Sequence, residues 1–126
     1  MPASVSHTAA ALLVAFGGAT GAVLRYAVGV WAVQAGQNAR WPWGTLAVNL
    51  VGSLAIGLLA PMLARNDVLR LLAVTGVLGG FTTFSAFSLD ALALLHAGRS
   101  GAALAYVAVS TVGGLALCAL GWRIAA

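Results

Sequence analysis

Long apolar runs separated by short polar stretches dominate the pattern along the chain. Each of the four runs reaches the roughly 20 residues that a helix needs to cross the hydrocarbon core of a bilayer. The runs cover about residues 9–33, 43–63, 68–96 and 101–124. The connections near residues 34–42, 64–67 and 97–100 are too short to hold a water-soluble domain. We therefore predict one domain over residues 1–126, an all-α integral membrane protein built as a bundle of four transmembrane helices.

The third run is interrupted in its middle. As one helix, its residues would extend for about 43 Å at 1.5 Å per residue, well beyond a hydrocarbon core of roughly 30 Å. Gly79 and Gly80 lower the helix propensity there, and Thr82 and Thr83 add β-branched side chains whose hydroxyls can bond to the backbone. We predict a broken third helix, with residues 79–83 non-helical at mid-membrane depth. Because lipid cannot satisfy freed backbone groups, such a break indicates an ion or substrate site.

Composition supports the membrane interpretation and excludes an ordinary soluble domain. Of the 126 residues, 62% are hydrophobic and only 6% are charged, and the mean hydropathy is +1.03. The first apolar run is too long for the core of a signal peptide, and no Lys or Arg precedes it. We therefore expect this run to remain in the protein as a helix.

The charged residues argue against nucleic acid and for a dual topology. All six basic residues are arginines scattered singly, so a nucleic-acid-binding role is not expected. The end of the bundle with both chain termini holds Arg65, Arg70 and Arg123, and the other end holds Arg40 and Arg99. A difference of three against two is too small to fix one orientation by the positive-inside rule. We predict that the chain inserts both ways and forms an antiparallel homodimer, which would also shield a polar path through so thin a bundle.

Small residues recur four positions apart in two of the runs, as Gly17 and Gly21 and as Ser53 and Gly57. This spacing is typical of faces on which membrane helices approach each other closely. We predict that both faces pack against neighbouring helices.

Polar side chains also recur at helical spacing within the apolar runs. Thr45, Asn49 and Ser53 lie every four residues in the second run, and Tyr106 and Ser110 repeat this spacing in the last. Burying such groups in hydrocarbon is costly unless something satisfies or uses them. The pattern predicts either a polar route through the bundle or hydrogen bonds between its helices.

The third run adds two rings and several hydroxyls. Phe84 and Phe87 are three residues apart and share one side of a helix, with Ser85 and Ser88 in an adjacent stripe. Neutral donors without an acidic ring favour an anion over a cation, and the positive edges of aromatic rings also suit a small anion. Plain core packing of the two rings remains the alternative.

The sequence leaves two other classes of membrane protein and an enzyme as alternatives. A small dual-topology multidrug exporter needs a carboxylate within the membrane, and the first run has none. Asp90, the one intramembrane candidate, is expected to pair with Arg25 or a helix end. A membrane subunit without transport of its own is the second alternative. An enzyme is not expected, because Asp90 and His96 lie off a common helical face and no other catalytic set occurs.

Three blocks of sequence resemble the CrcB/Fluc family of small fluoride channels, and the resemblance extends over nearly the whole chain. The blocks are residues 17–26 (GGATGAVLRY), 41–52 (WPWGTLAVNLVG) and 76–87 (GVLGGFTTFSAF), of which the third is highly specific. The resemblance implies passive, fluoride-selective export that lowers cytoplasmic fluoride. It also implies two fluoride pathways in an antiparallel, dual-topology homodimer in the cell inner (plasma) membrane.

The resemblance also implies roles for individual residues. The backbone carbonyls of Gly79 and Thr82 would hold a structural sodium ion at the dimer centre, and Arg25 would face a vestibule or bond helix ends. Snorkelling to the interface is the alternative for Arg25. The implied fluoride pathway, together with nearby hydroxyls, consists of Asn49, Thr83, Phe84, Ser85, Phe87, Tyr106 and Ser110. Gly114 stands where some relatives have another serine.

Overall fold

A computed structural model describes residues 4–36 and 40–126. Within these residues, four helical paths are long and apolar enough to cross a membrane, as predicted. Three of them are continuous: α1 (His7–Gln34), α2 (Trp43–Met62) and α6 (Ser100–Ala125). Each lies within a few residues of its predicted bounds. Residues 37–39 of the predicted first connection lie outside the described residues.

The third path is divided, and its elements are α3 (Asp67–Leu69), η2 (Arg70–Leu78), α4 (Gly79–Phe81) and α5 (Phe84–His96). The predicted break is present, but it is shorter than residues 79–83. Gly79 has helical angles (φ −62°, ψ −38°), whereas Thr82 (φ −84°, ψ 155°) and Thr83 (φ −149°, ψ 120°) are extended. The π-helical segment η2, in which hydrogen bonds skip one residue more than in an α-helix, was not predicted.

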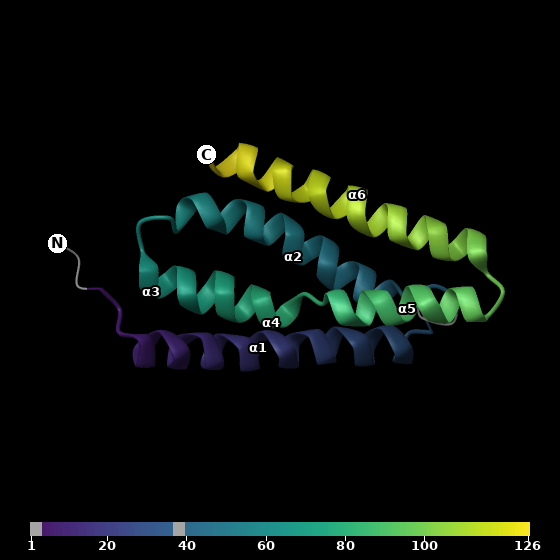
Figure 1. The fold of residues 1–126 in the computed structure, drawn as a ribbon, viewed down its shortest axis with the longest axis horizontal. Helices are drawn as coiled ribbons and strands as arrows, with labels where there is room; N and C mark the ends of the chain where they lie inside the picture. Colours follow the sequence, from purple (N-terminus) through teal and green to yellow (C-terminus); the bar gives the residue numbers. More distant parts are fainter. Residues whose placement is uncertain (1–3, 37–39) are drawn as a thin grey trace.

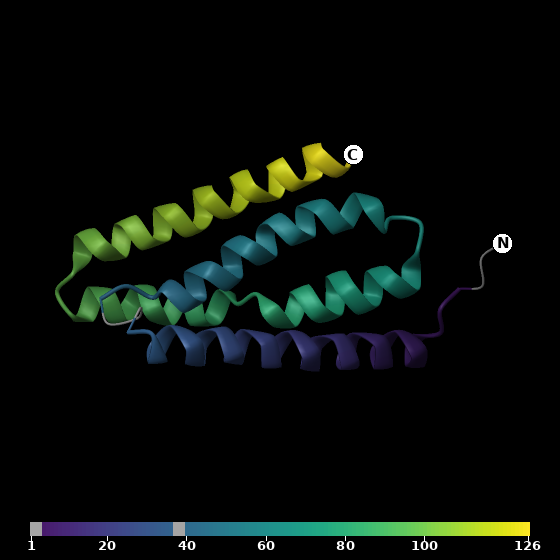
Figure 2. The same ribbon diagram turned by 180° about the vertical axis from the view of Figure 1, so that it is seen from behind.

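The helices pack in two main pairs, which Figures 1 and 2 show from opposite sides. α6 lies along α2, and α1 lies along η2 and α4. The start of α1, the connection after α2 and the C-terminus lie at one end of the bundle. The end of α1, the start of α2 and the connection between α5 and α6 lie at the other. The break after α4 therefore lies between the two ends, at the depth expected for the middle of a membrane.

Glycines allow α1 to approach the third path closely, as the spacing of Gly17 and Gly21 predicts. A Cβ atom placed on Gly17 would come within 2.9 Å of the Cα of Gly76. One placed on Gly21 would come within 2.8 Å of the backbone nitrogen of Phe81, and it would also collide with the carbonyl of Val77. Real side chains do not tolerate such contacts with backbone. Gly17 and Gly21 thus let the backbone of α1 lie directly against the path that leads to the break.

Replacing Gly21 with alanine is expected to destabilise the chain by about 1–3 kcal/mol, because overpacking forces backbone shifts. Gly29 on the same helix is the matched control, since a Cβ placed there meets nothing within 4 Å. Gly29→Ala should leave stability unchanged or raise it slightly, because alanine is the better helix former. Unfolding of both variants in detergent micelles is the measurement. Equal stability of the two variants would contradict this packing.

Candidate functional site

The side chain of Asn49 on α2 satisfies the backbone at the helix break. Its Nδ2 donates a hydrogen bond to the carbonyl of Thr83 at 2.9 Å, and the Thr83 N–H donates to its Oδ1 at 2.8 Å. One carboxamide therefore pairs with both polar backbone groups of one unwound residue. Such pairing is what non-helical backbone requires at membrane depth.

The two threonines of the break have different tasks. Thr82 caps the C-terminal end of α4, since both its N–H and its hydroxyl donate to the carbonyl of Leu78, at 3.0 and 2.9 Å. Thr83 begins α5, since its hydroxyl oxygen accepts from the N–H of Ala86 at 3.1 Å and lies 3.2 Å from the hydroxyl of Ser85. Because α5 begins here, its partly positive N-terminus lies at the break, where it favours an anion.

Arg25 connects α1 to the end of α4. Its Nε donates to the carbonyl of Gly80 at 3.2 Å, and its side chain is half-buried. The delocalised positive charge of its guanidinium lies beside a cavity of about 570 Å³, which Arg25 lines together with Thr45 and Thr83. The structure therefore gives Arg25 a bond to a helix end beside an open space.

A second cavity, of about 520 Å³, lies against the break and is bounded by α2, η2, α5 and α6. It brings together most of the residues predicted for the ion pathway and the sodium site. These are Asn49, Gly79, Thr82, Thr83, Phe84, Phe87 and Ser110. Ser85 and Tyr106 do not line it. All of its lining residues are uncharged, so this cavity, hereafter the break cavity, offers neutral polar groups and two aromatic rings.

A chain of ring contacts runs from the break cavity into the core. The ring centroids of Phe84 and Phe87 are 5.6 Å apart, and those of Phe87 and Tyr106 are 5.3 Å apart. Tyr106 is fully buried and continues the chain to Trp41, edge to face at 5.7 Å. Its hydroxyl donates to Oδ2 of Asp90 at 3.2 Å. The expected pairing of Asp90 with Arg25 or a helix end is therefore wrong, because Tyr106 lies directly across from it on α6.

Within the described part of the chain, some hydroxyls that line the break cavity already donate a hydrogen bond, whereas that of Ser110 does not. Ser53 donates to the carbonyl of Asn49 at 2.7 Å, and Thr111 donates to the carbonyl of Val107 at 2.7 Å. The hydroxyl of Ser110 is buried at the break cavity and has no hydrogen-bond partner among the described residues. At Gly114, the hydroxyl of Ser53 lies 3.3 Å from where a Cβ would be. Ser110 therefore offers the hydroxyl most in need of a partner.

Comparison with known proteins supplies the family. The family model described as "CrcB-like protein, Camphor Resistance (CrcB)" matches residues 12–122. The chain belongs to the CrcB family. The chain is also similar to proteins named "Fluoride-specific ion channel FluC".

These relatives come from three bacteria. The protein of Rhizobium johnstonii is 54% identical over 114 residues, which cover 87% of this chain and 89% of the relative. That of Agrobacterium fabrum is 56% identical over 105 residues, covering 79% and 82%. That of Novosphingobium aromaticivorans is 51% identical over 119 residues, covering 91% and 94%. The similarity therefore extends through the whole bundle of this CrcB-family chain.

The described part of this CrcB-family chain contains no group of three or more His, Cys, Asp or Glu side chains that could hold a metal. Backbone carbonyls are another source of oxygen ligands. Thr82 is extended, which turns its carbonyl out of the helical ladder, and Gly79 is exposed at the same cavity. Oxygen ligands of this kind suit a hard cation, so these two residues fit the predicted sodium site.

Sequence reasoning missed several features of this CrcB-family site. Thr75 on η2 and Thr111 on α6 also line the break cavity. Thr75 lies four residues before Gly79, so ordinary helical spacing, which places residues i and i+4 on one face, could have indicated it. The pairing of Asn49 with Thr83 joins residues 34 apart, so no local spacing indicates it.

Proposed function

We propose that this protein is a fluoride-specific ion channel through which fluoride leaves the cell passively, so that cytoplasmic fluoride falls. The uncharged break cavity, lined by neutral donors and two phenylalanine rings at the N-terminus of α5, carries the proposal. The names of the FluC relatives point the same way. The proposed activity is passive conduction, and no chemical reaction is involved.

Fluoride is small and tightly hydrated, so conduction needs donors that replace water without holding the ion too strongly. A carboxamide NH₂ has two hydrogens, and Asn49 spends one of them on Thr83, which leaves one for the ion. The hydroxyls of Ser110 and Ser85 and the edges of Phe84 and Phe87 would complete a shell of weak contacts. Larger halides would be rejected by a narrow, rigid route.

The proposal includes an antiparallel, dual-topology homodimer with two pathways. Phe84 is 79% exposed on a single chain although it lines the break cavity, so one chain alone does not enclose the path. The near balance of arginines between the two ends of the bundle also supports insertion in both directions. A second, inverted copy would cover the open side of the cavity.

A structural sodium ion at the dimer centre is the proposed cofactor. The backbone carbonyls of Gly79 and Thr82 from both chains would hold it. When bound, this fixed cation would lower the electrostatic cost of an anion in surroundings of low dielectric constant. Arg25, beside its own cavity near the break, would draw anions toward the path.

Ion efflux from liposomes that contain only the purified chain tests the proposed function. We expect fluoride efflux well above the efflux from protein-free liposomes. Chloride efflux should equal that from protein-free liposomes. Chloride efflux comparable to fluoride efflux would overturn the selectivity, and absence of any efflux would favour a subunit without transport of its own. The multidrug exporter has no support here, because α1 has no acidic residue and Asp90 already accepts a bond from Tyr106.

A further inference from the structure

A third cavity lies apart from the proposed pathway. It has a volume of about 240 Å³ and is lined by Arg40, Trp41, Pro42, Asp90 and Arg99, with Ala93 and Leu94. None of these residues lines either of the other two cavities. It occupies the end of the bundle where the connection before α2 meets the connection between α5 and α6. We call it the loop cavity.

Two arginines give the loop cavity a net positive charge. Arg99 donates from Nη1 to the backbone carbonyl of Arg40, which ties the two connections together. Asp90 is the opposing charge, and one of its oxygens accepts from Tyr106. Among the described residues, neither arginine forms an ion pair with it within 4.0 Å. The cavity therefore holds two cations and one carboxylate.

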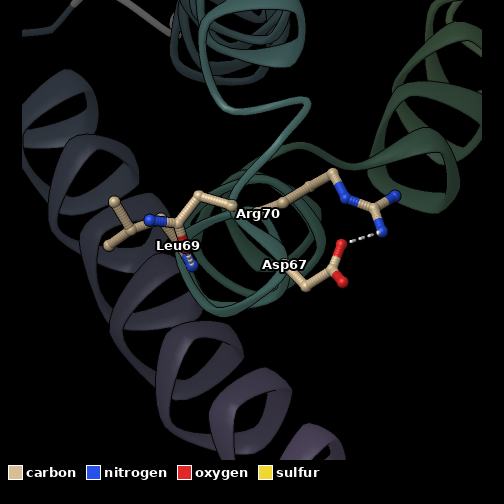
Figure 3. Close-up of polar contacts among 4 residues, drawn as sticks. Asp67, Leu69 and Arg70 are labelled. Carbon is tan, nitrogen blue, oxygen red and sulfur yellow. Dashed lines mark hydrogen bonds and ion pairs between the residues drawn. The ribbon is translucent and has the colours of Figure 1, made fainter. Parts of the chain in front are cut away.

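The opposite end of the bundle shows how an arginine is neutralised in this fold. Arg70 forms an ion pair with Asp67 three residues earlier, at 3.1 Å, and both side chains are exposed (Figure 3). Neither Arg40 nor Arg99 forms such an ion pair among the residues that the structure describes. Two arginines beside the single carboxylate of Asp90 leave the loop cavity with an excess of positive charge for an external anion.

Tryptophan side chains place the loop cavity at the membrane surface. Trp41 lines it, and its indole Nε1 is buried without a hydrogen-bond partner in the described part of the chain. Trp43 lies 6.0 Å from Trp41 between ring centroids and begins α2. Tryptophans at the ends of spanning helices favour the level of the lipid headgroups. Anionic headgroups are thus available at the level of this cavity.

We propose that the loop cavity binds the phosphate group of an anionic phospholipid, held between Arg40 and Arg99. Guanidinium groups bind phosphate oxygens through paired hydrogen bonds, and basic pockets at membrane surfaces bind anionic headgroups. The volume of about 240 Å³ leaves room for a phosphate group, because a single water takes up only about 30 Å³ in the liquid. The proposal does not depend on fluoride conduction.

Two double variants provide a matched test. The first pair is Arg40→Gln with Arg99→Gln, at the loop cavity, and the second pair is Arg65→Gln with Arg123→Gln, at the opposite end of the bundle. Each pair removes two charges from a chain of net charge +4. Each protein is incorporated into bilayers of equal phosphatidylcholine and phosphatidylglycerol, and the retained lipid is measured by native mass spectrometry. We expect the first pair to retain at least threefold less phosphatidylglycerol than wild type, and the second pair to match wild type. Equal losses in both pairs would overturn the proposal.

Three further measurements distinguish loss of lipid binding from loss of folding, and binding of lipid from binding of free phosphate. Unfolding in pure phosphatidylcholine checks that the first pair remains folded. Trp41→Phe removes the indole N–H donor together with part of the ring but keeps every charge, and it should retain less phosphatidylglycerol than wild type but more than the first pair. Adding inorganic phosphate to phosphatidylcholine bilayers should not stabilise the protein. Stabilisation equal to that by phosphatidylglycerol would indicate a site for free anions and overturn the lipid assignment.

Discussion

Asn49→Asp is expected to lower fluoride flux in liposomes by about 100-fold or more. In the native chain the Nδ2 of Asn49 donates to the Thr83 carbonyl, and the Thr83 N–H donates to its Oδ1. A carboxylate would place an oxygen against that carbonyl oxygen, and leaving a buried polar group unsatisfied costs about 1–3 kcal/mol, more where a charge is involved. It would also place a negative charge in the proposed path of an anion.

Asn66→Asp is the matched control for this variant. Asn66 caps α3 by accepting a hydrogen bond from the N–H of Leu69 at 3.0 Å, in an exposed position at the end of the bundle. Aspartate caps a helix as well as asparagine does, so stability and flux should stay near wild type although the charge change is identical. If Asn49→Asp conducted as well as Asn66→Asp, the assignment of Asn49 to the path would be wrong.

Phe84→Ile is expected to reduce fluoride flux by about tenfold or more while leaving the fold of the chain intact. The ring is 79% exposed on a single chain, so an aliphatic side chain there disturbs little of the core. What is lost is the aromatic edge, whose interactions are worth about 0.5–1.5 kcal/mol each, close to the 1.4 kcal/mol that corresponds to tenfold. The measurement is fluoride efflux together with unfolding of the purified variant.

Two other phenylalanines complete this experiment. Phe16→Ile on α1 removes a ring that is 73% exposed but lines none of the three cavities described above, and its flux should match wild type. Phe87 is only 8% exposed and contacts Tyr106, so Phe87→Ile should lose both flux and stability. A similar decrease in Phe16→Ile and Phe84→Ile would indicate a general effect of exposed rings on membrane insertion instead.

The spans were predictable because length and hydropathy alone decide whether a helix can cross a bilayer. The break was predictable from length together with the glycine and threonine pairs at residues 79–83, since α1 stays continuous over 28 residues and length alone does not distinguish the two. Its position was less accurate: Gly79 and Gly80 suggest unwinding by propensity, yet they stay helical. At Gly80 tertiary packing decides, because a Cβ there would lie 3.0 Å from the Cα and carbonyl carbon of Gly18 on α1.

The candidate site was predictable in its residues but not in its contacts. Helical spacing and the family motifs selected Asn49, Phe84 and Ser110, which the fold brings to one cavity. The bond between Asn49 and Thr83 and that between Asp90 and Tyr106 join separate helices, so their partners follow only from the packing. The π-helical register of η2 leaves no mark in the hydrophobic pattern, because its residues are apolar on most sides.

The central claim is that the helix break at Thr82 and Thr83 forms an ion site at the seam between two oppositely inserted chains. A high-resolution density map of the protein in lipid nanodiscs, prepared with sodium and fluoride, tests it most directly. We expect two antiparallel chains and a density peak on their twofold axis beside the carbonyls of Gly79 and Thr82. Parallel or single chains whose broken segment faces lipid, without an ion on an axis, would contradict the account.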